Sequence, residues 1–189
     1  AGVFPIDASK FDMVCIAGHK GMYGITSTGI LICNTEDIDT IIEGGSGSLS
    51  YLFTAPEVLP DRLEAGTLNT VGILSLNAGI EFLKSKKNIE QYEKRLCNYL
   101  YESLNKYDNI QFYSPGNTIL AFNINNKHSE EVTNFLNEKG FALRGGLQCS
   151  PLAHNHYGTS KQGVVRFSPS IFTKEIEVTS LIKNIRQIL

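Results

Sequence analysis

The sequence predicts an α/β protein, because short apolar runs typical of strands alternate with longer segments of helical periodicity. The apolar runs 13–17 and 29–33 are bounded by glycines or polar residues, which favours buried strands. Segments 69–84 and 88–107 place apolar residues three or four positions apart with polar residues between them, which predicts two helices. With 189 residues, of which 42% are apolar and 19% charged, the chain can form a folded core.

Composition and cysteine spacing exclude several classes of protein. The formal charge is −2 and basic residues do not cluster, so the sequence does not indicate nucleic-acid binding. Apolar runs stay well below the roughly 18 residues of a membrane span, and the first residues lack a signal-peptide pattern. We therefore expect no membrane association and a cytoplasmic protein. The four cysteines at 15, 33, 97 and 149 are far apart, which argues against a disulfide framework and against a metal site.

His19 and Lys20 directly follow the first apolar run. The C-terminal ends of strands are where open α/β sheets bind ligands. An amine at the end of an apolar strand is poorly solvated, which favours its neutral, nucleophilic form. Such amines form Schiff bases with carbonyls, including the aldehyde of pyridoxal phosphate. The alternative is a strand end whose basic side chains simply reach solvent.

The segment between the second strand and the first long helix is rich in turn residues. A polar turn from 34 to 39 is expected to open a short helix through Ile42. Residues 43–50, rich in glycine and serine, form either a flexible connector or a loop whose backbone N–H groups bind an anion. Gly66 permits a close backbone approach and Thr67 offers a hydroxyl, which together suit a phosphate oxygen.

Beyond the second helix the pattern predicts an α+β unit. Strands are expected at 110–113, 119–124, 141–144 and 164–167. Ser129 is predicted to cap a helix over 129–139, and Thr173 to cap the last helix. The domain boundary is expected inside or just after the long helix that ends near Tyr107, and the chain is divided into residues 1–107 and 108–189.

Cys149 and Arg166 are the two further candidates for chemistry. A lone cysteine is usually an inert small apolar residue, but Cys149 lies in a glycine-flanked loop near Arg144, His154 and His156. Cationic neighbours favour the reactive thiolate. Arg166 stands in an apolar strand and needs an anionic partner, either a structural carboxylate or the carboxylate of a substrate. Arg144 is a weaker candidate for the same pocket, and the other three cysteines are predicted to be structural.

Four ordered segments, at 13–24, 64–70, 144–154 and 163–168, resemble class V aminotransferases and cysteine desulfurases, including those related to selenocysteine lyases. These are pyridoxal-phosphate enzymes of fold type I, and the resemblance covers only their C-terminal half. It implies that Lys20 binds the cofactor and that Thr67 and Gly66 contact the phosphate of the other subunit of a homodimer. It further implies that Arg166 holds the amino-acid substrate and that Cys149 accepts its sulfur.

Two departures from the family pattern concern the cofactor. Ala17 stands where family members often have a serine, so one hydroxyl that could bind phosphate is missing. Residues 1–7 lack an initiator methionine and do not look like a first structural element. By resemblance, the aspartate that pairs with the pyridine nitrogen and the group that stacks on the ring would lie upstream. The chain is therefore expected to hold the cofactor lysine without the rest of its binding site.

Three functional hypotheses follow. The first is a cysteine desulfurase or selenocysteine lyase that releases alanine, transfers sulfur to Cys149 and passes it to an acceptor protein. The second is a class V aminotransferase that uses Lys20 for proton transfer and leaves Cys149 idle. The third, of another class, is an inactive, cofactor-free C-terminal fragment.

Overall fold

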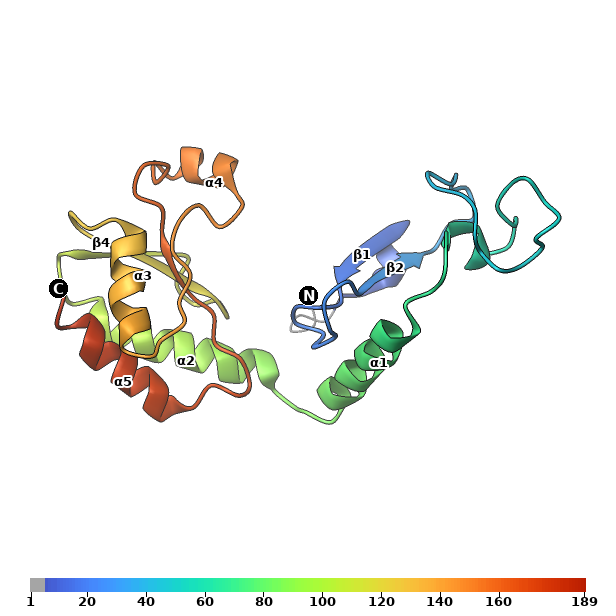
Figure 1. The fold of residues 1–189 in the computed structure, drawn as a ribbon. Coiled ribbons are helices and arrows are strands. Elements are labelled where there is room, and N and C mark those ends of the chain that lie inside the picture. The colour runs from blue at the N-terminus through green and yellow to red at the C-terminus, as the bar shows by residue number, and fades with distance from the viewer. Residues whose placement is uncertain (1–5) are drawn as a thin grey trace. The chain divides into compact units, whose positions relative to one another are not determined.

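The fold is given by a computed structural model that describes residues 6–189. It comprises two compact units, one ending at Lys87 and one beginning at Asn88 (Figure 1). The sequence placed the boundary after residue 107, whereas the structure places helix α2 (Ile89–Leu104) in the C-terminal unit. The reason is packing, since one face of α2 belongs to the core of that unit. The expectation about residues 1–7 falls largely on residues 1–5, which lie outside the described part.

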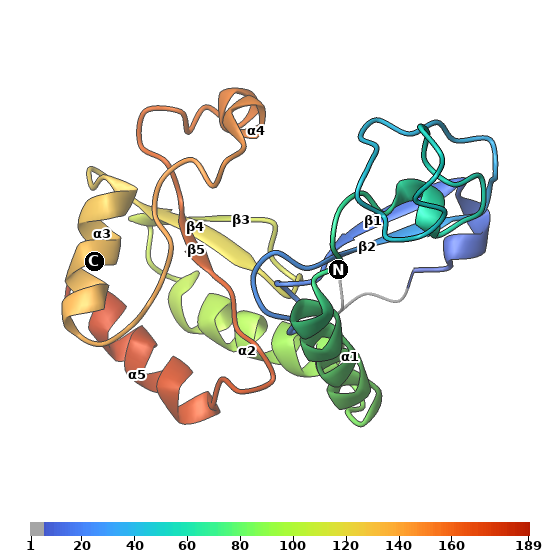
Figure 2. The same ribbon diagram turned by 45° about the vertical axis from the view of Figure 1, so that its right-hand side comes forward.

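The N-terminal unit contains a two-stranded antiparallel sheet and one long helix. Strands β1 (Met13–Ala17) and β2 (Gly29–Cys33) pair in full register, with Met13 opposite Cys33 and Ala17 opposite Gly29 (Figure 2). Short 3₁₀ turns, η1 (Ala8–Lys10) and η2 (Asp61–Leu63), precede the strands and the helix α1 (Thr70–Lys84) respectively. Both predicted strands are confirmed. Their predicted burial is wrong within this unit, because exposed and half-buried residues alternate along each strand.

Helix α1 supports the connection between β1 and β2. Its buried residues are Gly72, Leu76 and Gly79, which share one face. A Cβ at Gly79 would collide with the carbonyl oxygen of Met22, so the missing side chain lets the connection lie directly on the helix. Ser75 adds a polar contact by accepting a hydrogen bond from the N–H of Ile25 at 3.1 Å. The sequence of α1 therefore fixes the segment that carries His19 and Lys20.

The segment between β2 and α1 is mostly irregular. The short helix expected through Ile42 is absent, since residues 34–42 form bends and irregular backbone. Polar side chains replace a helical hydrogen-bond ladder there, and Asn34 donates to the carbonyl oxygens of Ala8 and Phe11 at 2.6 and 2.8 Å. The glycine- and serine-rich segment 43–50 is a loop, as predicted.

The C-terminal unit is a three-stranded antiparallel sheet packed with helices. Strand β4 (Leu120–Ile124) lies between β3 (Ile110–Tyr113) and β5 (Val165–Phe167). Helix α3 (Ser129–Glu138) packs on β4 and β5, while α5 (Glu175–Ile185) packs on α2. A further short helix, α4 (Pro151–His156), lies in the connection that leads to β5 (Figure 1). The core comprises side chains from the sheet and from helices α2, α3 and α5, among them Leu96, Leu100, Phe122, Leu136, Val165 and Ile182.

Several local predictions for this unit need correction. Residues 141–144 do not form a strand; only Arg144 makes a β-bridge, to Arg166. His128 rather than Ser129 caps α3, because the Ser129 hydroxyl donates to the carbonyl oxygen of Gln162 at 2.7 Å. The last helix is capped one residue later than expected, at Lys174. Helix α4 was not predicted, since its six residues show no clear helical period.

Two absences concern residues 6–189. None of the helices there combines the length and the apolar character required to cross a bilayer. No three His, Cys, Asp or Glu side chains in this range are grouped so that they could hold a metal ion.

Candidate active site

Lys20 lies in a tight turn that begins where β1 ends. The N–H of Gly24 donates to the carbonyl oxygen of Gly18 at 2.9 Å, and the N–H of Tyr23 donates to the carbonyl oxygen of Lys20 at 3.0 Å. Tyr23 has a φ of 57°, a left-handed conformation that residues with a Cβ seldom adopt. Thr28 closes the turn, since its carbonyl oxygen accepts a hydrogen bond of 3.0 Å from the N–H of Gly18. The backbone around Lys20 is thus well determined.

The side chains of His19 and Lys20 are exposed, so the expected desolvation of the amine does not hold within this unit. Within this unit the sheet has two strands, and the turn that carries both side chains packs on α1. Among residues 6–189, the amine of Lys20 makes no hydrogen bond or ion pair. It is therefore available to react with a carbonyl compound.

Gly66 and Thr67 form a second element of the N-terminal unit, just before α1. Gly66 has a φ of 79°, and nothing lies within 4 Å of the position that its Cβ would take. Its N–H is engaged, donating to the carbonyl oxygen of Gly44 at 2.8 Å. A phosphate oxygen could therefore approach the open Cα of Gly66, but the donor would have to be the exposed Thr67 hydroxyl, which has no partner in the described chain.

These groups fit the chemistry of pyridoxal phosphate. The free amine of Lys20 suits the aldehyde, and the free hydroxyl of Thr67 suits a phosphate oxygen. The open space at Gly66 permits the close approach that a bulky phosphate requires. Ala17 adds no hydroxyl donor.

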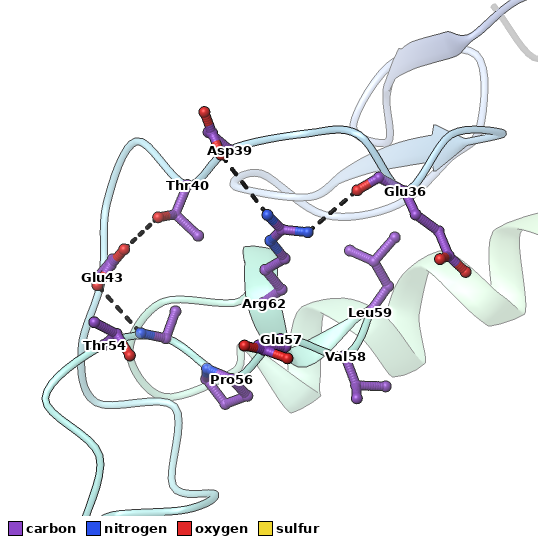
Figure 3. A pocket seen from close by; sticks show the side chains of 11 residues that line it. Glu36, Asp39, Thr40, Glu43, Thr54, Pro56, Glu57, Val58, Leu59 and Arg62 are labelled. Atoms are coloured by element: carbon purple, nitrogen blue, oxygen red, sulfur yellow. Dashed lines mark hydrogen bonds and ion pairs between the residues drawn. The ribbon is translucent and has the colours of Figure 1, made fainter.

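The N-terminal unit also holds a cavity of about 660 Å³ that is separate from these residues. Figure 3 shows Arg62 within it, paired with Asp39 at 3.7 Å and donating to the carbonyl oxygen of Glu36 at 3.2 Å. Hydrogen bonds from the Thr40 hydroxyl and from a backbone N–H hold the pKa of Glu43 below its usual value. No predicted site residue lines this cavity. Its polar groups stabilise the irregular segment before α1.

In the C-terminal unit, Cys149 lies in the connection between α3 and α4, two residues before α4 begins. Its thiol is exposed, and Nη2 of Arg144 lies 3.0 Å from its sulfur. Both Gln148 and Cys149 have left-handed backbone conformations, with φ of 54° and 61°. The predicted cationic neighbour is therefore Arg144. His154 is not one, because it is buried and its Nδ1 is hydrogen-bonded to the Thr159 hydroxyl at 2.8 Å.

Glycines and a buried serine anchor the base of this loop. A Cβ at Gly145 would crowd the backbone of Ser129, so only glycine allows the loop to lie on the start of α3. The N–H of Gly146 donates to the Ser129 hydroxyl at 3.0 Å, and that hydroxyl donates to the carbonyl oxygen of Gln162. The N–H of Val164 donates to the carbonyl oxygen of Gly146 at 3.1 Å. The two ends of the loop are thereby joined.

Arg166 lies on β5 directly beside the loop. Its backbone exchanges hydrogen bonds with Arg144, of 2.8 Å and 3.4 Å. Its Nε is buried and has no hydrogen-bond partner, and no carboxylate of residues 6–189 pairs with the guanidinium. The alternative of a structural carboxylate therefore finds no such partner among the described residues. An arginine with an unused buried donor can receive an anion.

The other cysteines differ from Cys149. Burial in α2, together with the nearby Glu93 carboxyl, raises the pKa of Cys97 to about 12, so it stays a thiol. Cys15 is exposed on β1 and Cys33 is half-buried on β2, and neither contacts a cationic group. Only Cys149 combines exposure with an arginine contact.

The structure gathers the predicted residues in two groups, one in each unit. Lys20, His19, Gly66 and Thr67 belong to the N-terminal unit, and Arg144, Cys149 and Arg166 to the C-terminal unit. Sequence reasoning missed Gln148 and Ser129, which organise the Cys149 loop. A possible signal for Gln148 was its position next to the candidate cysteine, but nothing in the sequence distinguished its side chain from a solvated one.

Comparisons of the sequence with known proteins agree on one protein family. The profile of the family described as aminotransferase class-V matches residues 2–181. Proteins named cysteine desulfurase from Cronobacter sakazakii and Salmonella agona are 31% and 32% identical over 193 residues. Each match covers 97% of this chain but 47% of the relative. The chain thus spans about half the length of these curated relatives.

Solved structures show the same fold and the same partial coverage. The cysteine desulfurase CsdA from Escherichia coli matches with a TM-score of 0.85 at 24% identity, over 97% of this chain and 48% of that chain. A cysteine desulfurase from Thermococcus onnurineus matches with a TM-score of 0.84, over 99% and 50%. The α/β fold predicted from the sequence is confirmed, and it is consistent with the C-terminal part of a type I pyridoxal-phosphate fold.

Proposed function

The chain belongs to the class-V aminotransferase family, and from this premise we propose that it provides the cofactor lysine, the sulfur-accepting cysteine and the substrate-binding arginine of a cysteine desulfurase. The proposal includes pyridoxal phosphate as the cofactor and a free amino acid, cysteine or selenocysteine, as the substrate. It is a proposal for the protein to which this chain contributes, since the chain spans about half the length of its relatives.

The observation that carries the proposal is the contact between Arg144 and Cys149. Nη2 of Arg144 lies 3.0 Å from the sulfur, and the thiol is exposed. The guanidinium donates a hydrogen bond to this sulfur and so holds an exposed nucleophile in one position. An aminotransferase has no use for such a nucleophile. The contact therefore favours sulfur transfer within the family.

The reaction that we propose for Cys149 balances without a further oxidant. The thiolate attacks the sulfur of the substrate, and an S–S bond forms as the substrate's C–S bond breaks. The electron pair of the broken bond stays with the substrate's β-carbon, which takes up a proton and becomes the methyl group of alanine. Cys149 is left as a persulfide, with one sulfur more than before. An acceptor protein would then remove that sulfur, which is accessible because Cys149 is exposed.

Arg166 is proposed to hold the α-carboxylate of the substrate. Its guanidinium has no anionic partner among residues 6–189, and its buried Nε is unused. A carboxylate bound through parallel N–H···O bonds would satisfy that donor. Through the β-bridge between Arg144 and Arg166, the proposed substrate-binding residue and the residue that contacts the sulfur lie on neighbouring backbone segments. The substrate and the nucleophile would thus be oriented by one rigid structure.

The N-terminal unit is proposed to provide the cofactor contacts. Lys20 would hold the aldehyde of the cofactor, with His19 beside it in the turn, and Thr67 with Gly66 would receive a phosphate group. By resemblance that phosphate belongs to a second copy of the chain in a homodimer. When bound, pyridoxal phosphate supplies an electron sink for bonds at the substrate's α- and β-carbons.

The test is Cys149→Ser in the holoenzyme that contains this chain. We expect the variant to form no persulfide and to lose most alanine production from cysteine, because a hydroxyl at this position cannot accept sulfur. Binding of cysteine, followed by the change in cofactor absorbance, should persist, since it relies on Lys20 and Arg166. Cys33→Ser serves as the matched control and should retain the parental rate.

Two outcomes would decide against the proposal. Alanine production from cysteine at the parental rate in Cys149→Ser would show that the thiol is idle, as in an aminotransferase. A purified parent that shows no near-visible absorbance after incubation with pyridoxal phosphate would identify an inactive, cofactor-free fragment. The assay must use cysteine, because the selenium of selenocysteine leaves more readily and does not test the thiol.

A further inference from the structure

The loop that carries Cys149 has an unusual backbone. Gln148 and Cys149 are consecutive residues with side chains, and both adopt left-handed φ values, of 54° and 61°. This conformation is unfavourable for residues other than glycine, and it persists only where the surroundings impose it. Gly145 and Gly146 precede this pair and anchor the base of the loop on Ser129. Another group holds the left-handed pair itself.

The side-chain amide of Gln148 is that group. Its Nε2 lies 3.1 Å from the carbonyl oxygen of Arg144, 3.4 Å from that of Gly146 and 3.2 Å from that of Val164. These acceptors belong to the start and the end of the loop. One amide group therefore ties the residue before Cys149 to both ends of the loop and to the backbone of the arginine that contacts the sulfur.

The other end of the same amide has no partner. Oε1 of Gln148 is buried and accepts no hydrogen bond among residues 6–189. A buried acceptor without a donor is unfavourable, so the amide is oriented by what its nitrogen donates to. The side chain is thus held by its contacts to the three carbonyl groups, although its oxygen is unsatisfied.

We propose that Gln148 is a positioning residue that holds the thiol of Cys149 beside the guanidinium of Arg144. Its amide holds the left-handed pair and donates to the carbonyl oxygen of Arg144, the residue whose guanidinium contacts the sulfur. The consequence for sulfur transfer rests on the proposed desulfurase function. The positioning of the thiol is a property of this chain alone and can be measured without cofactor or substrate.

The test measures the alkylation rate of Cys149 by iodoacetamide at pH 7, using mass spectrometry of the Cys149 peptide. The variant is Gln148→Met, which keeps the length of the side chain but has no N–H to donate. We expect alkylation to slow by about three- to tenfold, the effect of losing one or two net hydrogen bonds that keep the sulfur beside Arg144. Gln187→Met, at an exposed glutamine, is the matched control and should leave the rate unchanged.

A double-mutant cycle separates positioning from a general loss of structure. Arg144→Ala should slow alkylation by itself. Gln148→Met added to Arg144→Ala should have no further effect, because the contact that Gln148 is proposed to position is already absent. Cys97, which is buried, reports integrity: it should remain unlabelled in every variant. Cys15, in the other unit, provides an internal reference rate.

Three results would overturn the proposal. They are an unchanged or faster rate in Gln148→Met, an equal loss of rate with and without Arg144, and labelling of Cys97 in parallel with Cys149. None of them involves alanine production. Failure of the desulfurase function would instead appear as a parent holoenzyme that makes no alanine from cysteine while the alkylation cycle gives the expected result.

Discussion

Glu93 is a buried carboxyl group in helix α2 that should make the stability of the C-terminal unit depend on pH. Glu93 is only 4% exposed, and its carboxyl group has no ion-pair partner among residues 6–189. Desolvation raises the pKa of Glu93 from 4.5 to about 7. The buried position penalises the carboxylate, so the folded state keeps the proton to higher pH than the unfolded state does.

The sign and size of the effect follow from this difference. Below pH 4.5 the group is protonated in both states and contributes no penalty. Between pH 4.5 and 7 the unfolded state releases its proton while the folded state retains it, so the free energy of unfolding falls as pH rises. Above pH 7 both states are ionised and the loss is complete. The loss amounts to about 3 kcal/mol, since one pKa unit corresponds to about 1.36 kcal/mol.

Glu93→Gln removes the ionisable group and keeps the shape of the side chain. The stability difference between variant and parent should grow by about 3 kcal/mol in favour of the variant from pH 4.5 to pH 8. Amide hydrogen exchange of α5 peptides, which pack on α2, gives the difference at each pH, because the intrinsic exchange rate cancels between the two proteins. Glu102→Gln, on the solvent-exposed side of α2, is the control and should show no such growth.

The outcome that would refute this reasoning is a stability difference that stays constant within about 0.5 kcal/mol from pH 4.5 to 8, the accuracy expected of such comparisons. It would mean that water or an unrecognised donor solvates the carboxylate in the folded state. A difference that grows equally in Glu102→Gln would instead indicate an effect of net charge.

Two further predictions concern the N-terminal unit. Lys20→Ala in the holoenzyme should abolish the borohydride-reducible cofactor adduct, and mass spectrometry of the reduced parent should place the cofactor mass on the Lys20 peptide; an adduct on another lysine contradicts the assignment. Gly79→Ala should destabilise the unit by about 1–3 kcal/mol, because its methyl group meets the carbonyl oxygen of Met22. Urea titration measures this loss. Gly29→Ala, where a Cβ would lie 3.5 Å from its nearest neighbour, should lower the free energy of unfolding by less, and equal losses in the two variants would show that the Gly79 contact is not specific.

The strands and long helices could be predicted because their signals are local. β1, β2 and α1 match apolar runs and a helical period, and the start and end of each lie within a few residues of the prediction. Their burial could not be predicted in the same way. An apolar run indicates that a strand is suited to burial, but whether it is covered depends on neighbouring strands and helices, and β1 has only β2 beside it in the described unit.

Local signals also failed where tertiary contacts decide the conformation. Ser129 has the sequence signature of a helix cap, yet its hydroxyl is used by Gln162 and Gly146 at the base of the Cys149 loop. The boundary after residue 107 was placed at the end of an uninterrupted helix, whereas the packing of α2 on α5 puts that helix in the second unit. In both cases a long-range contact outweighed the local preference.

The candidate chemistry shows the same division between residue type and geometry. Cys149 could be proposed from the sequence, because cationic residues lie near it along the chain, but the sequence could not choose among Arg144, His154 and His156. The fold makes the choice: His154 turns into the protein toward Thr159, and the β-bridge to Arg166 brings Arg144 to the sulfur. Backbone pairing with Arg166 fixes the segment of Arg144 that contacts the sulfur, so in the proposed desulfurase this one β-bridge would place both the substrate-binding arginine and the arginine beside the nucleophile.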